Sequence, residues 1–125
     1  MPKVKYTAAK GLVQSSGSGI VLEKTNATAS GNAYTANGNC GVLTTASLTT
    51  VAGATTATQT VTNDRVTAGS NVFLTARVGA SQTVNGTAVP HIVAVAAGSF
   101  TFEITNIKGS GQALDDVVYV HYLVV

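Results

Sequence analysis

The sequence has little of what cross-links or charges an ordinary soluble domain. It has no tryptophan, two prolines and one cysteine, Cys40, in 125 residues. A single cysteine excludes an intrachain disulfide, so the fold must depend on its packed core. Charged residues make up 10% of the chain, whereas about 25% is usual in soluble domains. We therefore expect much of the surface to be rich in hydroxyl and amide groups or buried against a partner.

Long apolar runs are also missing, which excludes a membrane-spanning helix. The longest run, Ile92–Ala97, is far shorter than the roughly 20 residues that a span requires. No apolar segment of a secretory signal peptide follows Met1–Lys5, so we expect the protein to stay in the compartment where it is made or to leave by cell lysis. The net charge of +2 is too small for an electrostatic footprint on nucleic acid. The sequence therefore predicts neither a membrane nor a nucleic acid as partner.

Alternation of apolar and polar residues is the main pattern in the chain, and it predicts β-strands. The clearest strand is Ser99–Asn106, in which Phe100, Phe102 and Ile104 share one face. Threonine and glutamate occupy the other face. We therefore expect one side of this strand to lie in the core and the other side in water.

Two further strands carry apolar residues on a face that should be wet. Asn71–Val78 alternates in the same way, except that Phe73 lies on its polar side. Asp116–Val125 is apolar on both faces, as expected of a central strand that is covered twice. In a small β-protein the second cover is often another subunit, so we predict a subunit interface here. Its residues are Phe73, Tyr119, His121 and Leu123.

Weaker patterns and turn residues complete the prediction of the fold. Further short strands are expected at Val4–Tyr6, Gly19–Leu22, Gly41–Thr45, Thr55–Thr62 and Pro90–Ala96. Glycine-rich and Asn-Gly turns separate the strands. This spacing predicts an all-β protein, a jelly-roll-like antiparallel β-sandwich of about eight strands. We expect an extended N-terminal arm at residues 1–15, a single domain at residues 16–125, and a long loop at Asn26–Asn39 that crosses one end of the sandwich.

Side chains that could carry catalysis or hold a metal are few. The chain has five acidic residues and two histidines. A glycan hydrolase needs two convergent carboxylates, but Glu23 and Glu103 are the only glutamates. His121 lies within an apolar strand, and Asp115-Asp116 lacks the further oxygen ligands that a hard cation needs. We predict that the protein is not an enzyme and has no catalytic residue, metal or cofactor.

Low-complexity, β-forming segments occupy most of the chain after residue 40. These segments are Gly41–Thr45, Val51–Thr56, Val61–Asn63, Val66–Ala68 and Val95–Asn106, with a short closing strand after Leu114. Together they resemble a motif of tailed-bacteriophage virion proteins, over about residues 41–125. The resemblance implies a β-sandwich or jelly-roll-like domain, often trimeric, on capsid surfaces or at fibre tips. It carries over no catalytic residue.

Two functions of a virion protein are consistent with this resemblance. The first is a capsid decoration or cement protein, made in the host bacterial cytoplasm and located on the outer surface of the head. Its partners would be copies of itself, as a homotrimer, and the major capsid protein, whose acidic surface the arm residues Lys3, Lys5 and Lys10 would contact. The alternative is a tail-fibre or tail-tip module that binds a host receptor, with Asn26–Asn39 giving its specificity.

Overall fold

The computed structural model describes residues 4–7, 11–14, 24–79 and 86–125, and within these ranges the regular elements are all β-strands. Their bounds are β1 Val4–Thr7, β2 Gly11–Gln14, β3 Ala27–Thr28, β4 Ala33–Thr35, β5 Cys40–Thr44, β6 Gln59–Thr62, β7 Val72–Val78, β8 Ala88–Ala96, β9 Ser99–Asn106 and β10 Val118–Val124.

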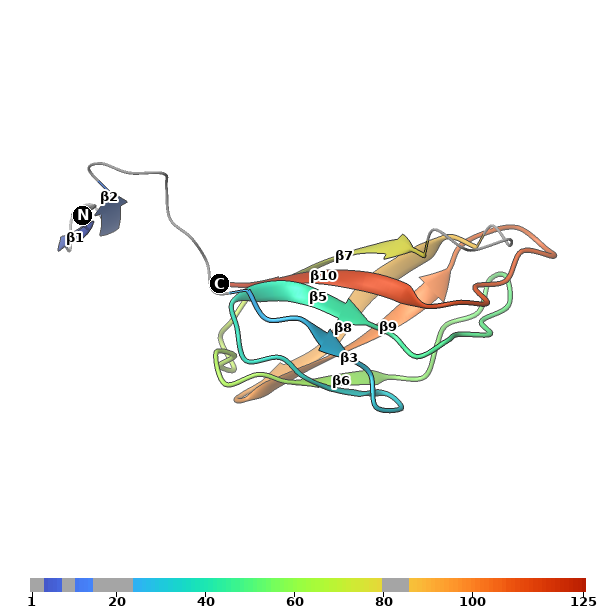
Figure 1. The fold of residues 1–125 in the computed structure, drawn as a ribbon, viewed down its shortest axis with the longest axis horizontal. Helices are drawn as coiled ribbons and strands as arrows, with labels where there is room; N and C mark the ends of the chain where they lie inside the picture. The colour runs from blue at the N-terminus through green and yellow to red at the C-terminus, as the bar shows by residue number, and fades with distance from the viewer. Residues whose placement is uncertain (1–3, 8–10, 15–23, 80–85) are drawn as a thin grey trace.

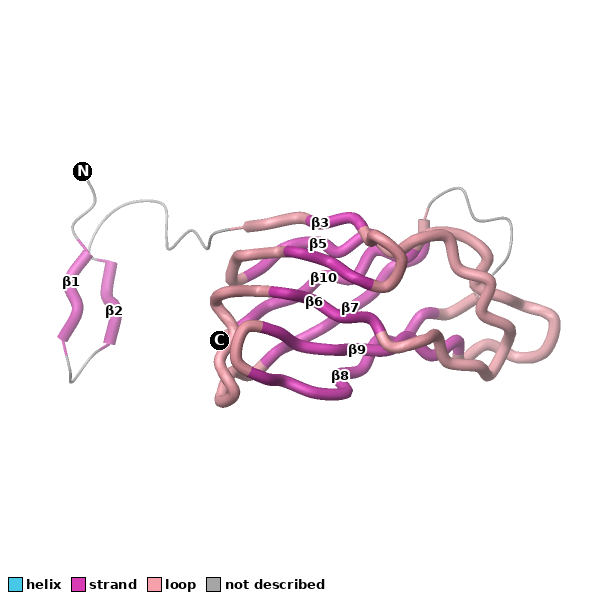
Figure 2. The backbone as a smooth tube through the Cα atoms, turned by 90° about the horizontal axis from the view of Figure 1, so that it is seen from below, coloured by secondary structure: helices cyan, strands magenta, loops and turns pink. Residues whose placement is uncertain are grey.

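Eight of these strands form a sandwich of two four-stranded sheets (Figure 1). One sheet has the order β3-β5-β10-β7, and the other has the order β4-β6-β9-β8. Figure 2 shows β3 at one side of the sandwich and β8 at the opposite side. The all-β sandwich of about eight strands that the alternation predicts is thereby confirmed.

The pairing is mixed, whereas the sequence predicted a wholly antiparallel sandwich. β3 runs parallel to β5, and β4 runs parallel to β6. Both extra strands come from Asn26–Asn39, so the prediction of a long loop there was wrong. The chain turns at Gly31, which has a φ of 64°, and adds one short strand to each sheet. Strands of two and three residues are too short to show a period of two, which is why the pattern missed them.

The longer strands lie close to their predicted positions. β7, β8, β9 and β10 each match a predicted strand to within two residues at either end, because alternation over seven or more residues is a strong local signal. The strand predicted at Thr55–Thr62 is only half present. β6 covers its second half, while Thr55 makes an isolated bridge to Thr105. The strand predicted at Gly19–Leu22 lies outside the described residues.

The predicted arm contains a small antiparallel ladder. β1 pairs with β2, with Val4 opposite Gln14 and Thr7 opposite Gly11. The strand predicted at Val4–Tyr6 is therefore present, but its partner is β2 and not an edge of the sandwich. Residues 15–23, where the predicted arm meets the domain, lie outside the described residues, so the boundary between residues 15 and 16 stays a prediction.

The core lies between the two sheets and is aromatic at its centre. Phe100 and Phe102 of β9 are almost fully buried, and Phe102 packs against Tyr34 with ring centroids 6.0 Å apart. Phe100 also contacts Tyr122 of β10, at 6.1 Å. The buried face of β9 is the face that the sequence predicted, because alternate side chains of a strand point to opposite sides of the sheet.

One core residue carries a polar group that burial affects strongly. The hydroxyl of Tyr34 donates a hydrogen bond of 2.9 Å to Oε1 of Gln59, and both residues are 3% exposed. Burial raises the pKa of Tyr34 from 10.0 to about 12, because the phenolate is poorly solvated between the sheets. The native state therefore holds this proton at pH values where the unfolded chain releases it.

We expect the free energy of unfolding to fall as the pH rises from 10 towards 12 through this group. Between those values unfolding releases the Tyr34 proton, so the stability falls by up to about 1.4 kcal/mol per pH unit. Below pH 10 the contribution is fully present. Urea unfolding at pH 9, 10 and 11 measures the free energy of unfolding. The Tyr34→Phe variant should lose less of this free energy over that range than the unchanged protein. Equal declines in the two proteins would contradict the assignment.

Candidate functional site

The outward-facing side of the β3-β5-β10-β7 sheet carries the residues that the sequence predicted as an interface. Val118, Val120, Tyr122 and Val124 of β10 are buried, so the alternate positions of this strand point outward. The same alternation applies to β7 and β5. We call this surface the outer face, and its residues are Cys40, Val42 and Thr44 of β5, Tyr119, His121 and Leu123 of β10, and Phe73, Thr75 and Arg77 of β7.

The strand register arranges the outer face in three rows across the sheet. Leu123 lies opposite both Cys40 and Phe73, which gives one apolar row. In the next row His121 lies between Val42 and Thr75. The four residues predicted as an interface are therefore brought onto one surface. Phe73 is 59% exposed, so a large aromatic side chain of this surface is open to water.

Arg77 is held in the third row by an aromatic ring. Its guanidinium carbon lies 4.1 Å from the centre of the Tyr119 ring, a cation–π contact that fixes the side chain against the sheet. Arg77 and Tyr119 are paired in the register of β7 and β10. The sequence reasoning missed Arg77, Cys40 and Val42 as parts of this surface, because only the pairing of β5 and β7 with β10 places them there.

The outer side of the other sheet is polar along β9, as is usual for a sandwich face in water, although β8 exposes Val89 and Val93, at 39% and 50%. Glu103 of β9 accepts a hydrogen bond of 2.6 Å from the hydroxyl of Thr58 and lies 3.6 Å from Nε2 of His91. Thr55 and Thr105 share a hydrogen bond of 2.9 Å nearby. The outward side of β9 is therefore polar, whereas the outward side of β10 carries Tyr119, His121 and Leu123.

The side chains that could take part in catalysis or bind a metal do not converge in the described part of the chain. Glu103 faces His91 on the polar sheet, whereas His121 lies on the outer face of the other sheet. Asp116 uses Oδ1 to accept a hydrogen bond of 2.7 Å from the backbone N–H of Val117. Glu23 lies outside the described residues. No three histidine, cysteine, aspartate or glutamate side chains of the described ranges are grouped as metal ligands would be.

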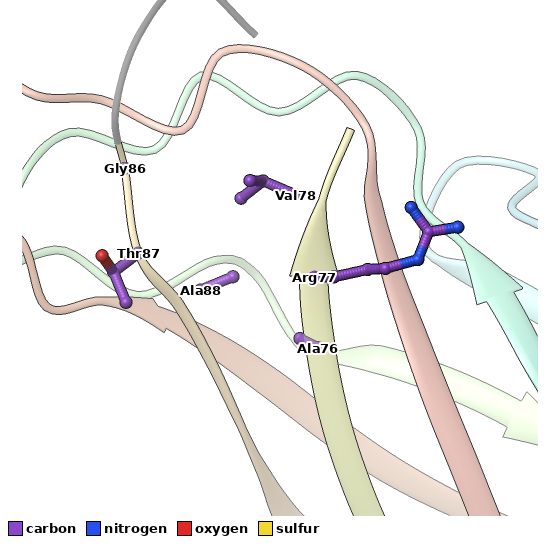
Figure 3. Close-up of a pocket in the computed structure, with 6 residues that line it drawn as sticks. All are labelled: Ala76, Arg77, Val78, Gly86, Thr87 and Ala88. Carbon is purple, nitrogen blue, oxygen red and sulfur yellow. The ribbon is translucent and has the colours of Figure 1, made fainter. Parts of the chain in front are cut away.

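The hollows of the described surface are shallow and open. One of about 290 Å³ lies between β7 and β8, lined by Ala76, Val78, Gly86, Thr87 and Ala88, with Arg77 at its margin (Figure 3). The guanidinium of Arg77 points away from the other lining residues. A small-molecule site usually combines an enclosed apolar pocket with a few convergent polar groups. This hollow is open, and its two polar side chains, Thr87 and Arg77, do not converge.

The predicted capsid-contact lysines lie near the N-terminus. Lys5 belongs to β1, while Lys3 and Lys10 lie outside the described residues. Their predicted contact with a capsid stays a prediction. No helix of a length and hydropathy suited to crossing a membrane occurs among the described residues.

Comparison with known protein families, with characterised proteins and with solved structures gives no match to this chain. What is shown of the predicted virion protein is therefore its all-β sandwich of two packed sheets.

Proposed function

We propose that this protein is a structural component of a bacteriophage particle, a decoration or cement protein on the outside of the head. In this role it catalyses no reaction. It packs against copies of itself and against the major capsid protein, and the added contacts hold neighbouring capsid subunits together. It is made in the cytoplasm of the host bacterium and functions on the virion.

The observation that carries the proposal is the outer face. A sheet face in contact with water normally bears polar residues, whereas this one bears Phe73, Leu123 and Val42 in neighbouring positions. Covering such residues stabilises an assembly by about 25 cal/mol for each Å² of apolar surface removed from water. Permanent assemblies use apolar contacts of this kind. We infer that this surface is covered when the protein joins the particle.

The composition supports a protein that functions within an assembly. Charged residues are 10% of the chain, which is few for a protein that stays soluble as a monomer. Lys3, Lys5 and Lys10 concentrate positive charge in the N-terminal segment. In the proposal this segment contacts an acidic capsid surface, and the sandwich lies above it.

We expect antibodies against this protein to label the heads of the parent phage evenly. Immunogold electron microscopy of purified particles measures this, and antibody first absorbed with the purified protein serves as the control. Label confined to tails or fibre tips would instead support receptor binding. Particles without label would contradict a virion protein of either kind.

A further inference from the structure

The four edge strands of the sandwich differ in how well they are protected from pairing with another chain. β3 and β4 have two and three residues. β8 contains Pro90 and a register irregularity between Ile92 and Ala94. Short edges, prolines and bulges all prevent strand addition. β7 has none of these features, since it runs for seven residues without proline and in unbroken register with β10.

The backbone of β7 directs every second pair of N–H and C=O groups away from β10, at its outer edge. The N–H groups of Asn71 and Val125 each donate to the carbonyl oxygen of the other residue. Hydrogen-bonded pairs alternate along an antiparallel ladder, so odd-numbered residues of β7 bond to β10. The N–H and C=O groups of Val72, Leu74, Ala76 and Val78 therefore point away from β10. No described residue pairs with them.

We propose that β7 pairs antiparallel with β7 of a second copy, about a two-fold axis at Thr75. In this register Leu74 lies opposite Ala76 of the second copy, and Val72 lies opposite Val78 of the second copy. All the outward N–H and C=O groups at these four positions then find partners across the axis. The two four-stranded sheets become one sheet of eight strands.

The side chains of β7 complement themselves in this register. On the inner side a large residue, Leu74, meets a small one, Ala76. On the outer face Phe73 of each copy, 59% exposed in one chain, lies opposite Arg77 of the other, whose guanidinium stays over Tyr119 of its own chain. The two Arg77 side chains are offset by four residues along the strand direction, or about 14 Å, so they do not oppose each other.

The partial burial of β7 also favours a second strand beside it. Val72, Leu74, Ala76 and Val78 pack against the core but are only partly buried. Ala76 and Val78 line the hollow between β7 and β8 that Figure 3 shows. A strand added at the β7 edge covers these side chains, because alternate residues of the added strand point to the same side of the sheet.

This pairing specifies how copies associate within the proposed function, but it does not depend on the particle that they join. An isologous two-fold contact closes after two copies. The expected product is therefore a dimer, in place of the trimer that the resemblance implies.

Charge substitutions at Thr75 test the pairing, because this residue faces itself across the axis. Thr75 is exposed on the outer face, so the single chain should tolerate the change. We expect the unchanged protein to have the mass of two 12.6 kDa chains in sedimentation equilibrium. Thr75→Lys and Thr75→Glu should each weaken the dimer by up to about fivefold, since like charges directly opposite repel. A mixture of the two variants should form dimers again.

Matched controls and a cross-link complete the test. Thr60 is exposed on β6 of the polar sheet, and Thr60→Lys and Thr60→Glu should leave the dimer unchanged. Thr75→Cys should form a disulfide-linked dimer on oxidation, because facing residues at a non-hydrogen-bonded position have Cα atoms about 4.5 Å apart. Thr60→Cys controls for Cys40 and for random collision. A monomeric unchanged protein, or a dimer that Thr75→Lys leaves intact, overturns the pairing; head labelling by antibody would still support the virion role.

Discussion

Replacing Asn106 with alanine should lower the free energy of unfolding by about 3–4 kcal/mol. Asn106 ends β9 and is 0% exposed. Its Nδ2 group donates to the carbonyl oxygens of Thr50 and Gln112, at 3.2 and 2.8 Å. Its Oδ1 atom accepts from the N–H groups of Thr87 and Lys108, at 3.0 and 3.2 Å. One side chain thus joins four backbone groups at one end of the sandwich.

The loss is large because alanine leaves these backbone groups without their partner. An unmatched polar group in a protein interior costs about 1–3 kcal/mol, and partial access to water reduces that figure here. Urea unfolding with Asn71→Ala as control measures the effect, since Asn71 is exposed and the same atoms are removed. A loss below about 1 kcal/mol in Asn106→Ala would show that water replaces the amide without penalty.

Replacing Gly41 with alanine should destabilise the protein by about 3 kcal/mol. Gly41 lies in β5 where the chain at Thr25 passes very close. A Cβ atom at Gly41 would overlap the carbonyl oxygen of Thr25 and approach Cε1 of Tyr122 to 2.9 Å. The same carbonyl accepts a hydrogen bond of 3.0 Å from the Tyr122 hydroxyl.

Relief of this overlap requires the segment before β3 to move away from β5. That movement breaks the hydrogen bond of 2.8 Å from the N–H of Thr25 to the carbonyl of Cys40. Gly69→Ala is the matched control, because a Cβ atom there meets nothing within 4 Å and its φ is not positive. Thermal unfolding of both variants gives the comparison. Equal midpoints would mean that the Thr25 segment contributes nothing to the stability of the sandwich.

The structural roles of Asn63 and Asn106 could not be predicted from the sequence. Both follow or end a predicted strand and look like ordinary turn residues. Asn63 is in fact 0% exposed, and its Nδ2 group donates to the carbonyl of Gly38 at 2.8 Å. Each amide has one partner two residues away, the N–H of Arg65 or of Lys108. Other partners, such as Gly38 for Asn63 and Thr50 for Asn106, lie far away in the chain. No local pattern marks a polar residue whose partners are distant, so only the folded chain identifies it.

The outer face was predictable in part. Phe73 and the outward residues of β10 broke the alternation of apolar and polar positions, and a break of this kind is visible in the sequence. Val42 and Arg77 gave no such signal, since each is ordinary in its own strand. They belong to the surface because β5 and β7 flank β10, and strand neighbours are set by contacts between distant residues.

The sequence by itself determined that this is an all-β sandwich, which face of β9 is buried, and that the surface is poor in charge. These properties depend on composition and on the period of two, which each strand carries locally. Only the tertiary structure decided that Asn26–Asn39 supplies two parallel edge strands, and that β7 is an edge strand of seven residues in unbroken register with β10. Strand order and register depend on which distant segments bury each other's apolar faces. A local sequence pattern therefore does not predict them.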